Sequence, residues 1–110
     1  MLSSIVASAL LFFHHSTKAE PVIAVSATRL YSKHCAECHG KDGRAQTSKG
    51  RFSHARDLTD AKWQDDVSDE RIFNSIMNGR NVRGNMPAFS DKLNQKDTDE
   101  LVSFVRKFKK

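Results

Sequence analysis

Apolar residues recur at helical spacing in three stretches of this chain. In the first, Ala27, Leu30, Tyr31 and His34 fall on one side of a helix, which predicts a short amphipathic helix leading to residue 35. Gly40 then marks its end. No stretch shows a convincing β-strand pattern, so the sequence favours an all-α protein.

The second and third stretches carry clearer helix signals. Ser68 suits an N-cap, Gly79 follows the last turn, and Asp69 and Glu70 place negative charge where a helix dipole favours it. The apolar face of this second helix consists of Ile72, Phe73, Ile76 and Met77. The third helix is expected to begin at Asp97, and its apolar stripe consists of Leu101, Val102, Phe104, Val105 and Phe108.

Two long loops are predicted between these helices. Residues 41–57 are polar, contain two glycines and show no periodicity, which is typical of a loop. Residues 80–90 form a second irregular segment around Met86-Pro87. Between the first loop and the second helix, residues 57–60 open a turn or short helix that leads to Trp63.

Residues 1–19 are predicted to form a secretory signal peptide. Leu2 to Phe13 is an almost uninterrupted apolar run, followed by polar residues and the small Ala19. Cleavage after Ala19 is preferred and cleavage after Ala27 is a second option, which gives a short extension at 20–26 and a domain at 27–110. The run is shorter than the roughly 20 apolar residues that span a bilayer. We therefore expect an exported, soluble protein of the bacterial periplasm with no stable membrane span.

The 110 residues suffice for one small domain with a formal net charge of +5. Basic residues gather in two places, between residues 42 and 57 and in the loop before Met86, and these are Arg44, Lys49, Arg51, Arg56, Arg80 and Arg83. They suit a surface that attracts an acidic partner, although solvated loop charges give the same pattern. No nucleic-acid reader motif accompanies them, so nucleic acid is not expected as a partner.

The segment Cys35-Ala-Glu-Cys38-His39 is the strongest chemical signal in the chain. A Cys-x-x-Cys-His pentapeptide is the attachment site of a c-type haem. Two thiols about one helical turn apart can each add across one vinyl group of a single porphyrin. The histidine that follows them is then placed to coordinate the iron through a neutral imidazole nitrogen.

Three other interpretations of the two cysteines are weaker. A thioredoxin-like dithiol requires a βαβ context, which the sequence does not provide. A structural zinc site requires about four protein ligands, and no second ligand pair of suitable spacing exists. A disulfide between Cys35 and Cys38 would close a very small loop and would add little stability.

A haem held by one histidine leaves the sixth iron position open, and three residues compete for it. Met86 precedes Pro87 in a loop, where its sulfur can point inward, although an ordinary loop methionine would give the same sequence. Met77 lies on the apolar face of a predicted helix, where methionine usually fills the core. His54 is the nitrogen alternative and would make a bis-histidine haem.

These pieces together resemble the small class I c-type cytochromes, which are single-haem electron carriers. The resemblance spans residues 27–108 and depends most on the segment 35–40 and on Met86-Pro87-Ala88-Phe89. The supporting pieces are Leu30-Tyr31, Asp57-Leu58-Thr59, Ile76-x-x-Gly79 and Leu101-Val102-x-x-Val105-Arg106. It implies the class I cytochrome c fold, in which three to four short helices and long loops wrap around one covalent haem and the first and last helices cross.

The resemblance also implies roles for five residues. Cys35 and Cys38 would carry the thioethers of haem c, with His39 as the proximal ligand and Met86 as the distal ligand. Trp63 resembles the family's tryptophan near a haem propionate, with a plain core aromatic as the alternative.

The function implied is the transfer of single electrons between redox protein partners, without enzymatic activity. Two filled axial positions leave no place for oxygen or peroxide to bind. One alternative is an electron-entry subunit of a larger dehydrogenase or oxidase. Another is a haem sensor or weak peroxidase in which the Met86 ligand is labile.

Overall fold

The computed structural model describes residues 4–5, 7–14, 16 and 22–110, and these ranges contain helices but no β-strand. The helices are α1 (Val22–His34), α2 (Ala36–His39), α3 (Ser48–Ser53), α4 (Ala61–Asp66), α5 (Asp69–Asn78) and α6 (Gln95–Arg106). The all-α prediction is therefore confirmed. The expected number of three to four helices was too low, because α2, α3 and α4 have six residues or fewer and leave little periodicity in the sequence.

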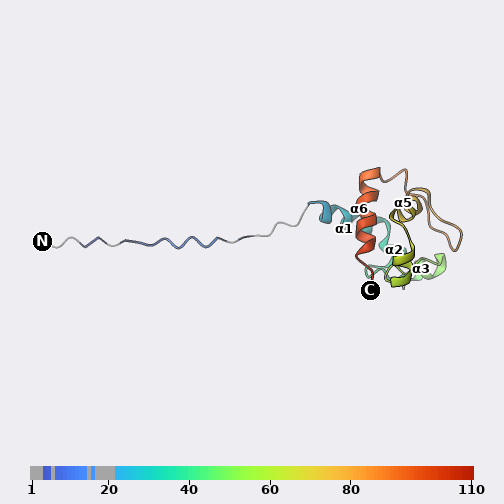
Figure 1. The fold of residues 1–110 in the computed structure, drawn as a ribbon, viewed down its shortest axis with the longest axis horizontal. Helices are drawn as coiled ribbons and strands as arrows, with labels where there is room; N and C mark the ends of the chain where they lie inside the picture. Colours follow the sequence, from blue (N-terminus) through green and yellow to red (C-terminus); the bar gives the residue numbers. More distant parts are fainter. Residues whose placement is uncertain (1–3, 6, 15, 17–21) are drawn as a thin grey trace.

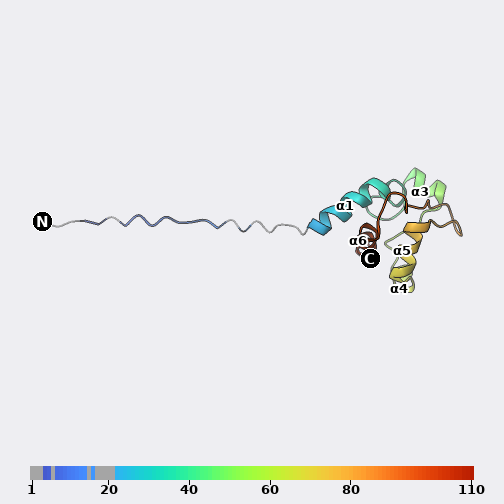
Figure 2. The ribbon, with the colours of Figure 1, turned by 90° about the horizontal axis from the view of Figure 1, so that it is seen from above.

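The first and last long helices cross, as Figures 1 and 2 show for α1 and α6. The Tyr31 ring of α1 lies 4.9 Å from the Phe104 ring and 5.1 Å from the Phe108 ring, measured between centroids. Leu101, on α6, is fully buried. Burying one such side chain stabilises the fold by about 1.5–3 kcal/mol, so this crossing is a major part of the core.

Helix α5 has the limits that the sequence predicted. The Ser68 hydroxyl accepts a hydrogen bond from the Arg71 N–H at 3.1 Å, and Gly79 ends the helix with φ of 75°. Helix α6 begins at Gln95 and not at the predicted Asp97. Its N-cap is Asn94, whose side chain accepts from the Asp97 N–H at 2.8 Å, so Asp97 belongs to a capping box inside the helix.

The predicted loop over residues 41–57 contains helix α3, which the sequence analysis missed. The Thr47 hydroxyl accepts from the Gly50 N–H at 2.9 Å and lies 2.7 Å from the Glu37 carbonyl oxygen, to which it donates. One side chain thus caps the start of α3 and satisfies a carbonyl of α2. Gly50 packs so closely on the Cys38 carbonyl oxygen that a Cβ there would overlap it.

Helix α6 is tied to α4 and α5 by Arg106. Its guanidinium donates to the Gln64 and Val67 carbonyl oxygens, each at 2.6 Å, and pairs with the Asp69 carboxylate at 2.7 Å. The buried Gln64 amide in turn donates to the Val105 carbonyl oxygen at 2.9 Å. These hydrogen bonds form the Arg106 clamp, which holds the short helix α4 against the body of the protein.

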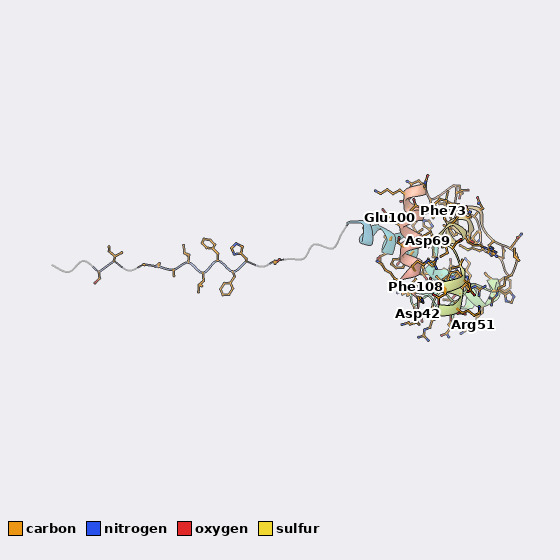
Figure 3. All side chains as sticks on the ribbon, in the orientation of Figure 1. Asp42, Arg51, Asp69, Phe73, Glu100 and Phe108 are labelled. Atoms are coloured by element: carbon orange, nitrogen blue, oxygen red, sulfur yellow. The ribbon has the colours of Figure 1, made fainter. Side chains whose placement is uncertain are left out.

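The described residues between 4 and 14 lie away from the helices (Figures 1 and 3). The large apolar side chains described in this stretch have exposed fractions of 79–91%, and they are Ile5, Leu10, Leu11, Phe12 and Phe13. The preferred cleavage site after Ala19 lies outside the described residues, whereas Ala27, the start of the expected domain, lies inside α1 and is buried. Among the described helices, none is long and apolar enough to cross a bilayer.

Candidate functional site

Two cavities adjoin in the helical body, with volumes of about 400 Å³ and about 570 Å³. We call them the first and the second cavity. Five residues line both of them, namely Cys35, His39, Arg56, Arg80 and Met86. Both volumes lie in the range of small-molecule and cofactor sites. The structure therefore brings the five predicted site residues together around these two cavities. Both cavities are lined by Cys35, His39 and Met86, the second also by Cys38 and the first also by Trp63.

Cys35 lies at the junction of α1 and α2. Its N–H donates to the Tyr31 carbonyl oxygen at 2.9 Å, and its own carbonyl accepts from the His39 N–H at 2.9 Å. Cys35 and Cys38 are not joined in a disulfide, and burial together with the nearby Cys38 raises the pKa of the Cys35 thiol to about 12. A reactive dithiol requires a lowered thiol pKa, so this environment argues against the thioredoxin-like interpretation.

His39 is oriented by a backbone carbonyl from the far end of the 41–57 segment. Its Nδ1 lies 2.9 Å from the Arg56 carbonyl oxygen and donates to it, which leaves Nε2 as the lone-pair nitrogen. Burial lowers the pKa of His39 and keeps the imidazole neutral. A neutral imidazole whose second nitrogen is fixed by a hydrogen bond is the form in which histidine binds metals.

Met86 is held by backbone contacts on both sides. Its N–H donates to the Arg80 carbonyl oxygen at 2.8 Å, and the Arg80 N–H donates back to the Met86 carbonyl oxygen at 2.9 Å. A Cβ at Gly79 would lie 2.7 Å from that same Met86 oxygen, so only glycine permits this approach. The end of the loop is fixed by the Phe89 N–H, which donates to the Ile76 carbonyl oxygen at 3.0 Å.

The two competing ligands have different surroundings. The Met77 sulfur accepts a hydrogen bond from the Thr98 hydroxyl at 3.1 Å, Thr98 is fully buried, and Met77 lines neither cavity. His54 lines the second cavity but is exposed, and its backbone is left-handed with φ of 53° at the end of α3. Of the three candidates, Met86 alone lines both cavities.

Trp63 is half-buried in the wall of the first cavity, and the Arg56 guanidinium lies 5.6 Å from its ring centroid. Burial, with the positive charges of Arg83 and Arg80, lowers the pKa of Arg56. The guanidinium groups of Arg80 and Arg83 are therefore close enough to act on that of Arg56. They give this part of the site a positive potential.

Sequence analysis missed three contributors to the site. The Arg56 carbonyl orients His39, Thr47 connects α2 with α3, and Gly84 approaches the Ser53 carbonyl so closely that a Cβ would overlap it. Thr47 precedes a short helix and could have been recognised as an N-cap. Every residue has a backbone carbonyl, so nothing in the sequence indicates that the Arg56 carbonyl orients His39.

The site combines two thiols, a neutral imidazole and a thioether around cofactor-sized cavities, and this donor set fits a c-type haem. A family model described as cytochrome c oxidase, cbb3-type, subunit III matches residues 24–105. The chain belongs to this family. It is a small class I c-type cytochrome, with haem c as its covalent cofactor.

Solved structures and a curated relative agree with the assignment. The cytochrome is 42% identical to the KustC0563 c-type cytochrome, with a TM-score of 0.70 over 76% of this chain and 98% of that one. It is 27% identical to the c-type cytochrome XoxG from Methylobacterium extorquens AM1, with a TM-score of 0.60 over 79% of this chain and 50% of that one. The cbb3-type cytochrome c oxidase subunit FixPc of Rhizobium leguminosarum bv. viciae is 29% identical over 90 residues, which cover 82% of this chain and 29% of that relative.

Proposed function

We propose that this cytochrome carries single electrons between redox proteins, with thioether bonds at Cys35 and Cys38 and iron ligation by His39 and Met86. The observation that carries the proposal is that His39 and Met86, from separate segments of the chain, line the same two cavities. Haem, when bound, supplies a one-electron ferrous–ferric couple. The protein's contribution is to hold the ligands still and to exclude other molecules.

The His39 ligand is supported by its hydrogen bond to the Arg56 carbonyl. The bond fixes the tautomer and the plane of the ring, so Nε2 keeps its lone pair available. The Met86 ligand is supported by its paired backbone contacts with Arg80. With both ligands fixed, little structure would have to rearrange on each transfer, and His39 and Met86 together would leave no iron position for oxygen or peroxide. This arrangement suits a carrier and not an enzyme.

The walls of the site would set the reduction potential. A thioether ligand favours ferrous iron over ferric iron and raises the potential relative to a second imidazole. Apolar side chains disfavour the extra charge of the ferric state and so raise the potential further, and those that line the cavities include Leu58, Ile72, Ile76, Phe89 and Leu101. Arg56, Arg80 and Trp63 line the first cavity and are suited to hold the haem propionates.

An acidic partner is supported by the rim of the second cavity. Its charged residues are six cations, Lys33, Lys49, Arg56, Arg80, Arg83 and Lys92, and one carboxylate, Glu37. The Glu37 carboxylate is already paired with Lys49 at 3.0 Å. A strongly positive rim steers negatively charged proteins toward the cavity, with an association rate that falls as salt is added.

Export to the periplasm is the location that we propose, with residues 1–19 removed as a leader. Ala27 is 3% exposed inside α1, so cleavage after Ala27 would remove the first turns of a packed helix. This burial supports cleavage after Ala19.

An electron-entry subunit of a larger oxidase is a second candidate. It is favoured by the match to the subunit III family model and by the similarity to the FixPc subunit. Purification of the tagged cytochrome from its native cells, with membrane complexes kept intact in the extract, separates the two roles. A stoichiometric oxidase in the purified material would support the subunit, and an isolated cytochrome whose reactions weaken with salt would support the carrier.

Visible spectra of the purified cytochrome, oxidised and reduced, test the proposed ligation. We expect covalent haem that shows the iron–sulfur charge-transfer band when oxidised and that binds neither carbon monoxide nor cyanide at ordinary rates. Rapid binding of either ligand by the native protein would contradict the closed site and would favour the sensor or weak peroxidase.

A further inference from the structure

Arg56 contacts the site with both its backbone and its side chain. Its carbonyl oxygen accepts a hydrogen bond from His39 Nδ1 at 2.9 Å, and its guanidinium lies 5.6 Å from the centroid of the Trp63 ring. A cation within about 6 Å of an aromatic centroid is attracted to the face of the ring. The Trp63 ring is therefore linked to the orientation of His39 through one intervening residue.

The backbone is anchored on each side of Arg56. The Ala55 N–H donates to the Gly50 carbonyl oxygen at 2.8 Å, and the Leu58 N–H donates to the Gly43 carbonyl oxygen at 2.7 Å. These two hydrogen bonds fix where the segment lies. Between them the backbone angles of Arg56 can still rotate, so a contact of its side chain also restrains the direction of its carbonyl.

The Arg56 guanidinium lies in surroundings that do not favour a cation. Burial and the positive charges of Arg83 and Arg80 lower its pKa, and the negative charge of Asp60 opposes this effect. In the part of the chain that the structure describes, no carboxylate forms a salt bridge with Arg56. The Trp63 ring therefore supplies a favourable contact that no ion pair replaces.

Helix α4 gives the Trp63 ring a firm support. The Asp60 side chain caps this helix by accepting a hydrogen bond from the Trp63 N–H at 3.1 Å. The Arg106 clamp holds the rest of the helix against α6. A series of contacts thus leads from α6 through α4 and the Trp63 ring to Arg56 and His39.

We propose that Trp63 is a positioning residue for His39 and that it acts through Arg56. The ring holds the guanidinium, and the restrained Arg56 directs its carbonyl toward His39 Nδ1. The proposal rests on the proposed function, because it takes His39 as an iron ligand. A firm hydrogen bond at Nδ1 makes the imidazole a more basic ligand, which favours ferric iron. Loss of the Trp63 ring should therefore weaken the bond and raise the reduction potential.

The His39 Nδ1 nitrogen reports on this bond in nuclear magnetic resonance spectra of the ferrous, haem-loaded protein. A donated hydrogen bond moves the resonance of this nitrogen downfield. In Trp63→Leu, which keeps the charge of Arg56, we expect the resonance to move upfield. The ratio of ferrous to ferric protein at a fixed potential should rise about threefold. Trp63→Phe keeps an aromatic face and should behave like wild type.

Arg56→Met distinguishes a role through Arg56 from a direct effect of the Trp63 ring on the cofactor. The variant keeps an unbranched side chain but removes the cation, so its Nδ1 resonance should move as far as that of Trp63→Leu. In the double variant, the loss of the ring should add no further shift. A further shift there, or an unmoved resonance in either single variant, would overturn the positioning role. If Trp63→Leu does not fold, the resonance of Arg56→Met decides alone.

Phe73→Leu controls for the loss of an aromatic side chain elsewhere. Phe73 is a half-buried residue of α5, labelled in Figure 3, that packs against the core and lines neither cavity. We expect this variant to be less stable than wild type and to leave the Nδ1 resonance unmoved. A shift equal to that of Trp63→Leu would mean that general loosening of the core explains both, and the positioning role would be refuted.

The same spectra test the proposed function separately. The ring protons of a histidine bound to iron lie above the haem plane, so those of His39 should be shifted strongly upfield in the ferrous protein. Ordinary positions for these protons would overturn iron ligation by His39. The Nδ1 resonances of the Trp63 and Arg56 variants would still decide whether Trp63 orients His39.

Discussion

The two sides of the haem site position their proposed ligands differently. On the His39 side, residues 35–56, both cysteines and the histidine fall within five consecutive residues, and one short helix places them. On the Met86 side, residues 79–90, the position of the proposed ligand also depends on a backbone contact with a segment elsewhere in the chain, the Asn85–Ser53 hydrogen bond. On the His39 side, local sequence brings the thiols and the imidazole together, and a distant carbonyl orients the ring. On the Met86 side, local contacts with Gly79 and Arg80 are joined by a hydrogen bond to the end of α3.

Removing both thiols should produce the largest effect, since it breaks the His39 side. We expect Cys35→Ala combined with Cys38→Ala to abolish covalent haem in protein matured by a haem-attaching host. The measurement is haem staining of a denaturing gel, and Met86→Ala is the control that keeps its stain. Covalent haem in the double variant would refute the attachment site.

Substitution of Met86, the proposed distal ligand, should affect the Met86 side alone. Met86→Ala is expected to retain covalent haem, lose the iron–sulfur charge-transfer band and shift to a lower reduction potential, because the thioether stabilises ferrous iron. Spectra and potentiometry measure both effects. Met77→Ala is the matched control, since the Met77 sulfur accepts from Thr98. If Met77→Ala loses the band and Met86→Ala keeps it, the ligand assignment is wrong.

Alanine at Gly79 should loosen the Met86 side without removing the ligand. The new Cβ would lie 2.7 Å from the Met86 carbonyl oxygen, and the φ of 75° disfavours any side chain. We expect a weakened charge-transfer band and a loss of about 1–3 kcal/mol in the free energy of unfolding. Denaturant titration followed at both the band and the far-ultraviolet signal measures this. If the two unfolding transitions of the variant coincide with each other and with those of the wild-type protein, the close approach of Gly79 to the Met86 carbonyl oxygen does not matter.

Valine at Thr47 should have the smallest effect, and this effect should be confined to the His39 side of the site. The variant removes the N-cap of α3 and the hydroxyl contact with the Glu37 carbonyl. A cost of about 1 kcal/mol in the free energy of unfolding is expected, with the Met86 charge-transfer band unchanged. If Thr47→Val weakens the charge-transfer band as much as Gly79→Ala does, the two sides of the site do not act independently.

The same contrast explains what sequence could predict. The pentapeptide at residues 35–39, the caps Ser68 and Gly79, and the apolar stripe of α6 each carry a signal within a few neighbouring residues. Helix α3 was missed because six residues with a glycine and a phenylalanine show no amphipathic period. The Arg56 carbonyl was missed because its role belongs to the backbone.

The early part of α6 shows a milder error of the same origin. Asn94 and Asp97 are both residue types that favour the N-cap position, and the tertiary structure determines which of them starts the helix. Residue type alone does not decide this. The capping box uses both, with Asn94 outside the helix and Asp97 within its first turn.

The Arg106 clamp has a consequence for how the protein opens. A helix of six residues such as α4 does not persist alone in water, and its amide hydrogens would then exchange with solvent almost as freely as those of a loop. Because Arg106 holds the Gln64 and Val67 carbonyl oxygens, α4 cannot unfold without releasing α6. We therefore expect the amides of α4 to exchange at the slow rate of α6, so that the Trp63 wall of the first cavity opens together with the crossing of α1 and α6.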